Sequence, residues 1–64
     1  MIAAKIKAAR QRAGMTQAQL AAELGTHQSA IARIEAGRHT PSIHMLERIA
    51  AALGCELYVE LCPR

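Results

Sequence analysis

The chain has 64 residues, which suffices for one domain but not for a large enzyme pocket, because a domain this small buries only about 60% of its unfolded surface. Hydrophobic residues make up 52% of the sequence, and eight basic against five acidic residues give a formal net charge of +3. The excess lies in residues 1–38, which hold six Lys or Arg and two Glu. Such a segment favours a polyanionic partner such as nucleic acid, although a solvated basic face would give the same count.

No segment of the sequence reads as a membrane span or a secretion signal. The longest apolar run, Ile49–Cys55, has seven residues, whereas a membrane-spanning helix needs about 20. Lysines near the N-terminus interrupt the apolar stretch that a signal peptide needs. The two cysteines, Cys55 and Cys62, match neither a zinc site nor a Cys-x-x-Cys redox motif. We therefore expect a cytoplasmic protein with reduced cysteines, no metal and no cofactor.

The first part of the chain predicts two short helices. Apolar residues at the spacing of one helical face begin the sequence: Ile2, Ile6, Ala9 and Ala13. This first helix is expected to end at Gly14. A capping box follows, in which the Thr16 hydroxyl accepts the backbone N–H of Gln19 and the Gln19 side chain reaches back to Thr16. It predicts a second helix that ends at Gly25.

Two further helices are predicted between the remaining glycines. Thr26 is the expected N-cap of the third helix, and Gly37 lies just past its end. The inward face of that helix is expected to consist of Ala30, Ile31 and Ile34. Thr40-Pro41 is expected to start a fourth helix, because proline is tolerated at a first helical position, and Gly54 to end it. The predicted buried stripe of the fourth helix consists of Ile43, Leu46, Ile49, Ala50 and Leu53.

The tail changes its hydrophobic period from 3.6 to 2, which predicts a β-strand over residues 55–62. The sequence offers no second strand to pair with it, so we expect the partner strand to come from another copy in a homodimer. The expected dimer interface contains Leu57, Tyr58, Val59 and Leu61. The alternative is a frayed tail. The predicted organisation is therefore a mainly α domain of four helices over residues 1–54 and a dimerisation strand over residues 55–64.

Residues 17–35 have the layout of a helix-turn-helix. Two short helices are separated by Gly25-Thr26-His27, and the small Ala21 lies where the second helix must cross the first closely. The residues expected to fill the angle between the helices are Leu20, Leu24, Ile31 and Ile34. The glycine, the small crossing residue and the apolar filling point independently to the same motif.

With these residues in place, the chain resembles the Cro and phage-repressor family of DNA-binding domains, which has the lambda-repressor-like fold. The resemblance covers residues 2–54. It rests on Arg10, Met15–Ala21, Gly25–Ile31, Ile34–Gly37, Pro41–Ser42, Leu46, Ile49, Ala50, Leu53 and Gly54. The resemblance implies that the third helix lies in the major groove, with the turn and the start of the second helix on the phosphates.

The outward residues of the third helix are the candidates for reading bases. Gln28 can form a bidentate pair with adenine, and Arg33 with guanine, each worth about 1–3 kcal/mol of discrimination. Ser29 offers a sequence-tolerant hydrogen bond, and Ala32 a small apolar contact to a thymine methyl group. Gln28 and Arg33 could instead be ordinary solvated helix residues.

The candidates for phosphate contact flank that helix. Gln17 lies at the first turn of the second helix, where the helix dipole favours an anion, and the family uses a matching glutamine on a phosphate. By the same resemblance, Arg38 and the backbone around Thr40 contact phosphate. His27 is left open between capping its helix, contacting a phosphate and facing water.

Arg10 and Glu35 are assigned to structure rather than to DNA or catalysis. In the family the matching pair forms a salt bridge between the first and third helices, which implies the same here. Removing one partner would then leave the other partly buried and unpaired.

We therefore predict a sequence-specific regulator of transcription, a repressor, that binds an inverted repeat in double-stranded DNA as a dimer. Its recognition helices would lie about 34 Å apart. The strand ending differs from the fifth helix common in phage repressors and is similar to that of small antitoxins of the same superfamily. The alternative is accordingly an antitoxin or other interaction module that binds a toxin or partner protein, with DNA binding as autoregulation. Its contact surface would be His44, Glu47 and Arg48 of the fourth helix, or the outer face of the strand. An enzyme is disfavoured because the chain has no Asp and no recognisable nucleophile elbow.

Overall fold

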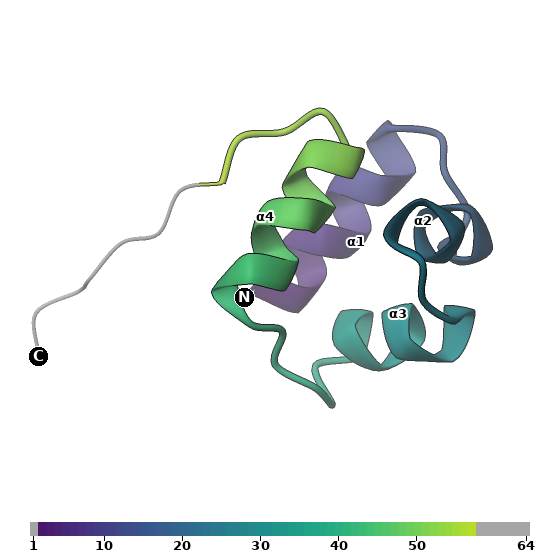
Figure 1. Ribbon diagram of the computed structural model, residues 1–64, viewed down its shortest axis with the longest axis vertical. Coiled ribbons are helices and arrows are strands. Elements are labelled where there is room, and N and C mark those ends of the chain that lie inside the picture. Colours follow the sequence, from purple (N-terminus) through teal and green to yellow (C-terminus); the bar gives the residue numbers. More distant parts are fainter. Residues whose placement is uncertain (1, 58–64) are drawn as a thin grey trace, which may run out of the picture.

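The computed structural model describes residues 2–57, and this part of the chain is helical (Figure 1). The helices, in chain order, are α1 (Ile2–Arg12), α2 (Gln17–Leu24), α3 (Gln28–Glu35) and α4 (Ile43–Ala52). Their number and order confirm the prediction of a four-helix domain. Within residues 2–57, no helix is long and apolar enough to cross a membrane.

The start of α2 is fixed by the predicted capping box. The Thr16 hydroxyl accepts the backbone N–H of Gln19 at 3.0 Å, and the Thr16 backbone N–H donates to Gln19 Oε1 at 2.8 Å. These two bonds satisfy the backbone N–H groups of Thr16 and Gln19, which have no carbonyl acceptor within the helix. The sequence pattern located this helix start correctly because both partners of the box are local.

The turn between α2 and α3 depends on Gly25, which adopts the left-handed conformation with a φ of 67°. The backbone N–H groups of Gly25 and Thr26 donate to the carbonyls of Ala22 and Ala21 at 3.2 and 2.9 Å. This is the Schellman arrangement, in which a residue without Cβ closes the helix end at little steric cost. The prediction that Thr26 caps α3 is wrong, because the N-cap residue is His27. Thr26 belongs instead to the end of α2.

The fourth helix begins later than predicted. Its N-cap is Ser42, whose hydroxyl accepts the backbone N–H of Met45 at 3.0 Å, so Thr40-Pro41 precedes the helix. Pro41 is buried in the connection before it. With this start, Ile43 is the first helical residue and is 55% exposed, which corrects its assignment to the buried stripe. Of that stripe, Ile49 and Leu53 are buried.

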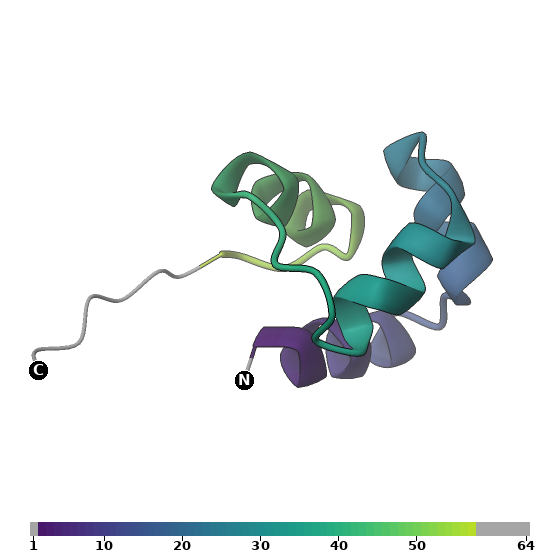
Figure 2. The same ribbon diagram turned by 90° about the horizontal axis from the view of Figure 1, so that it is seen from below.

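The core lies where α2 meets its neighbours. Leu20 and Ile31 are fully buried, with 0% and 1% of their surface exposed. Ala21 is also buried, as expected for the residue at which α3 crosses α2 closely. In Figures 1 and 2, α2 and α3 lie on one side of the molecule and α1 and α4 on the other, and across these two halves α1 packs on α3 and α4 packs on α2. Arg48 of α4 ties the halves together, because its Nη2 donates to the carbonyl of Leu24 at 2.7 Å.

The segment after α4 is described only as far as Leu57. Residues 55–57 form no strand, and Leu57 is half-buried. The remainder of the predicted strand, including Tyr58, Val59 and Leu61 of the expected dimer interface, lies outside the described residues.

Candidate nucleic-acid interface

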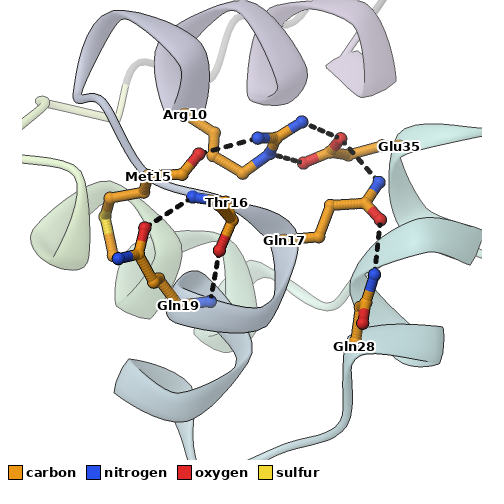
Figure 3. Close-up of polar contacts among 7 residues, drawn as sticks. All are labelled: Arg10, Met15, Thr16, Gln17, Gln19, Gln28 and Glu35. Atoms are coloured by element: carbon orange, nitrogen blue, oxygen red, sulfur yellow. Dashed lines mark hydrogen bonds and ion pairs between the residues drawn. The ribbon is translucent and has the colours of Figure 1, made fainter.

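A buried ion pair links α1 to the end of α3 (Figure 3). Arg10 Nε donates to Glu35 Oε2 at 2.7 Å, and Arg10 Nη2 donates to Glu35 Oε1 at 3.0 Å, which makes the pair bidentate. Arg10 Nη1 also donates to the backbone carbonyl of Met15 at 2.7 Å. The two side chains are only 10% and 3% exposed. The structure thus contains the ion pair that the family resemblance implies.

The ion pair shifts the protonation of both partners. Burial by itself raises the pKa of Glu35, but hydrogen bonds from Arg10 and Gln17, with the charges of Arg10 and Lys7, outweigh it, so this pKa lies below its ordinary value. The hydrogen bond to Glu35 raises the pKa of Arg10, with burial opposing it. Both groups are therefore charged at neutral pH. Each charge offsets the desolvation cost of the other, so removing one partner would leave a buried charge without compensation.

The network continues from the ion pair to the surface of α3. Gln17 Nε2 donates to Glu35 Oε1 at 3.2 Å, and Gln28 Nε2 lies 3.5 Å from Gln17 Oε1 (Figure 3). Gln17 is the first residue of α2, whose first backbone N–H groups have no intrahelical acceptor. The chain of contacts thus runs from a buried ion pair through a predicted phosphate-binding residue to a predicted base-reading residue.

The outward surface of α3 is polar and open. Gln28, Ser29 and Arg33 are exposed, and Ala32 is half-buried. His27, immediately before the helix, is exposed and makes no capping hydrogen bond with its side chain, which removes the capping role from its open alternatives. The inward surface of the same helix carries Ile31 and Ile34. The helix α3 therefore packs on the domain with its apolar surface and presents its polar surface to solvent, as a recognition helix requires.

A groove of about 410 Å³ runs between α3 and the connection to α4. Arg33 and Thr40 both line it, so a predicted base-reading residue and a predicted phosphate-binding residue lie on the same groove. His39 and the capping Ser42 line it as well. Arg38 is exposed at the end of α3, where its backbone N–H donates to the Arg33 carbonyl at 2.9 Å. Polar and basic groups therefore flank α3 on this side too.

Comparison with known proteins decides the family of the chain. Residues 6–59 match the family described as helix-turn-helix. The chain belongs to the helix-turn-helix family. It is 41% identical over 51 residues to an uncharacterized HTH-type transcriptional regulator of Methanothermobacter thermautotrophicus, covering 80% of this chain and 74% of that protein. It is 42% identical over 53 residues to the immunity repressor protein of Bacillus phage phi105, covering 83% of this chain. No solved structure gives a significant match.

The two relatives differ in how much of them this helix-turn-helix chain represents. It spans 37% of the phage immunity repressor, so the larger part of that protein has no counterpart in the matched region. These matches agree with the resemblance to phage repressors and support a DNA-binding regulator of transcription.

Two features in and around this helix-turn-helix were not predicted from the sequence. Glu35 was predicted to pair with Arg10, but its third hydrogen bond, from Gln17, was not foreseen. The only signal for this hydrogen bond in the sequence is a glutamine at the start of one helix and a glutamate at the end of the next. The second is that His39 lines the same groove as Arg33, a placement that was not predicted. Its position between the predicted phosphate contacts Arg38 and Thr40 was the available signal.

Proposed function

We propose that this chain is a sequence-specific repressor of transcription that binds duplex DNA by inserting α3 into the major groove. The observation that carries the proposal is the contact chain from Arg10 through Glu35 and Gln17 to the exposed amide of Gln28. A side chain held from behind by a buried anchor loses less conformational entropy when it binds a base edge. Such a regulator works where the DNA is, which we expect to be the cytoplasm.

Base recognition is assigned to four residues on the outward surface of α3. Gln28 pairs with the N6 and N7 edge of adenine, and Arg33 with O6 and N7 of guanine. Ser29 adds a hydrogen bond of low selectivity, and Ala32 a contact with a thymine methyl group. The exposure of Gln28, Ser29 and Arg33 supports these roles, since each is available to a partner.

Phosphate contacts are assigned to both flanks of α3. On one flank, Gln17 offers its side chain and the N–H groups at the start of α2, with His27 beside α3. On the other flank, Thr40 lines the same groove as Arg33, and Arg38 is exposed just after α3. A helix in the major groove has a phosphate backbone on either side, so two flanking sets of contacts fix its position and register.

The repressor is proposed to act as a homodimer on an inverted repeat. Its two recognition helices would be presented about 34 Å apart, one turn of the duplex. We assign the DNA-binding role to residues 1–54 and the pairing of copies to residues 55–64, through Leu57, Tyr58, Val59 and Leu61. A two-fold dimer doubles the number of base contacts without enlarging a very small domain.

The proposal is tested by selecting bound sequences from a random duplex pool at physiological salt. The wild type runs beside a Gln28→Ala, Arg33→Ala double variant and a control with Gln11→Ala and Lys7→Ala. The control loses one amide and one positive charge from exposed positions of α1. We expect the wild type and the control to enrich an inverted repeat that the double variant fails to enrich. No enrichment by the wild type, or equal enrichment by the double variant, would contradict the proposal.

A further inference from the structure

The contacts that lead from the ion pair to the surface of α3 have a direction as well as a position. A glutamine amide has one group that donates hydrogen bonds, Nε2, and one atom that accepts them, Oε1. Gln17 uses both, because its Nε2 donates to Glu35 Oε1 at 3.2 Å and its Oε1 lies 3.5 Å from Gln28 Nε2 (Figure 3). The Gln17 amide therefore has partners that distinguish its two ends.

The direction is set at the buried end, by Glu35. Its side chain is 3% exposed, and its carboxylate accepts two hydrogen bonds from Arg10 besides the one from Gln17. The group is ionised at neutral pH because its pKa lies below the ordinary value, so both oxygens accept and neither donates. A reversed Gln17 amide would place its Oε1 atom against a carboxylate oxygen, with no hydrogen between them. One orientation of Gln17 is therefore favoured.

Gln17 transmits this orientation to Gln28. With its Nε2 group bonded to Glu35, Gln17 turns an oxygen toward α3, and that oxygen attracts the Nε2 group of Gln28 and repels its Oε1 atom. The contact of 3.5 Å is long for a hydrogen bond, but its sign still differs between the two orientations. Within residues 2–57, this contact is the one side-chain hydrogen bond that Gln28 makes.

We propose that Glu35, acting through Gln17, determines which base pair Gln28 reads by fixing the direction of both amides. The inference rests on the proposed function, in which Gln28 contacts a base edge. It adds to that function a positioning residue that is buried and touches no base, yet decides specificity at one position of the operator.

The fixed direction suits adenine. One Nε2 hydrogen of Gln28 points to Gln17, which leaves the other beside Oε1, so the amide presents a donor and an acceptor side by side. Adenine offers the complementary N7 acceptor and N6 donor in the major groove, whereas guanine offers two acceptors, N7 and O6. A·T and T·A present the adenine groups in opposite order across the groove. An amide that could turn around would therefore discriminate less between these two base pairs.

Titrations of the full chain with duplex DNA test the inference. Gln28→Ala first identifies the base pair that Gln28 reads, as the position of the selected operator whose preference this variant loses. Affinities are then measured on four operators that carry each of the four base pairs at that position of one half-site. A ratio of two affinities for the same protein does not depend on its folded fraction, so a loss of stability alone leaves the ratio unchanged.

Two variants interrupt the contacts at different points. Glu35→Gln keeps the size of the side chain but allows a donor as well as an acceptor to face Gln17. Gln17→Met removes the amide and keeps the ion pair of Glu35 with Arg10, so it decides the outcome if Glu35→Gln does not fold. Ile49→Val is the matched control, because it removes a methyl group from the buried core on α4 and none of the polar contacts.

We expect the wild type and the Ile49→Val control to prefer A·T over T·A by about 5- to 150-fold, the range for a bidentate pair. Glu35→Gln and Gln17→Met should each reduce this preference by about two- to tenfold, the worth of one hydrogen bond. Preference at the position that Arg33 reads should stay unchanged in both variants, which a general distortion of α3 would not allow.

An unchanged preference in Glu35→Gln would overturn the inference, even if Gln17→Met loses its preference, because Gln17 would then orient Gln28 without Glu35. If Glu35→Gln does not fold, an unchanged preference in Gln17→Met overturns it. Equal losses at the Gln28 and Arg33 positions would overturn it as well. These results leave the proposed function standing. That function fails separately, and the inference with it, if Gln28→Ala alters preference at no position of the DNA.

Discussion

The α2–α3 half of this domain and the α1–α4 half differ in the chemistry of their exposed surfaces, which is polar in the first and apolar in the second. In the α2–α3 half, an exposed polar group is connected to a buried one. The amide of Gln28 contacts Gln17, and Gln17 donates a hydrogen bond to the buried Glu35. In the second, the surface between the helices is apolar, with Ile2 nearly half exposed. The polar surface has the chemistry that the proposed contact with DNA needs, whereas the apolar surface does not. The comparison teaches that a core of four helices and 64 residues can carry exposed surfaces of different chemistry.

Replacing Glu35 should give the largest effect, because it breaks the anchor of the polar half. Glu35→Ala leaves the buried Arg10 without its carboxylate, at a cost of about 3–5 kcal/mol for a buried pair. For a domain this small, we expect a fall in the melting temperature of more than about 10 °C. Thermal unfolding followed by circular dichroism measures it.

Gln28→Ala is the control, since an exposed substitution of this kind changes stability by about 0.5 kcal/mol or less. Equal melting temperatures for Glu35→Ala and Gln28→Ala would refute the role assigned to the ion pair.

Replacing Arg33 should alter the choice of sequence without unfolding the domain. We expect Arg33→Ala to lose about 1–3 kcal/mol per half-site of the selected operator and much less on random duplex, because each copy loses a bidentate pair with guanine. Competition titrations with the two duplexes measure the ratio of affinities. An unchanged ratio would show that Arg33 does not read bases.

Replacing Arg38 should weaken every duplex by a similar factor. A phosphate contact carries no sequence information, so Arg38→Ala is expected to leave the ratio of operator to random affinity unchanged. Both copies of the proposed dimer lose this contact, so the slope of log affinity against log salt should fall by about 1.8, at about 0.9 for each neutralised phosphate. If Arg38→Ala changed the preferred sequence instead, the division between base reading and phosphate contact would have to be reversed.

Acid should lower the stability of the folded protein, because Glu35 becomes protonated and its ion pair with Arg10 is lost. Its pKa is lowered in the folded protein, so its stabilising contribution is complete above the ordinary value of 4.5 and is lost as the pH falls through the lower folded value. We expect the melting temperature to drop in this range. Because Glu35→Gln has no charge to lose there, its melting temperature should fall less over the same interval. Parallel curves for the two proteins would assign the acid sensitivity elsewhere.

Features that depend on neighbours in sequence could be predicted, and those that depend on distant contacts could not. The capping box at Thr16 and the left-handed turn at Gly25 are local, and both were located from residue types alone. The start of α4 was misplaced, because the sequence offers Thr40 and Ser42 as alternative caps and the burial of Pro41 before the helix has no local signal.

The candidate site shows the same limit. Exposure of Gln28 and Arg33 followed from the period of the helix, whereas the contact of Gln17 with Glu35 joins residues 18 positions apart. It became visible only when α2 and α3 were placed against one another. The assignments of base and phosphate contacts, the domain division, the dimer and the antitoxin alternative stay predictions.

The central claim, that α3 reads base edges in the major groove, is tested most directly by coupling Arg33 to one atom of the operator. Affinities are measured for the wild type and Arg33→Ala on the selected operator, with guanine or 7-deazaguanine at each conserved G in turn. At one such position we expect the loss of N7 to weaken the wild type and to leave Arg33→Ala unaffected, which gives a coupling energy. Equal losses for both proteins at every guanine would contradict the claim.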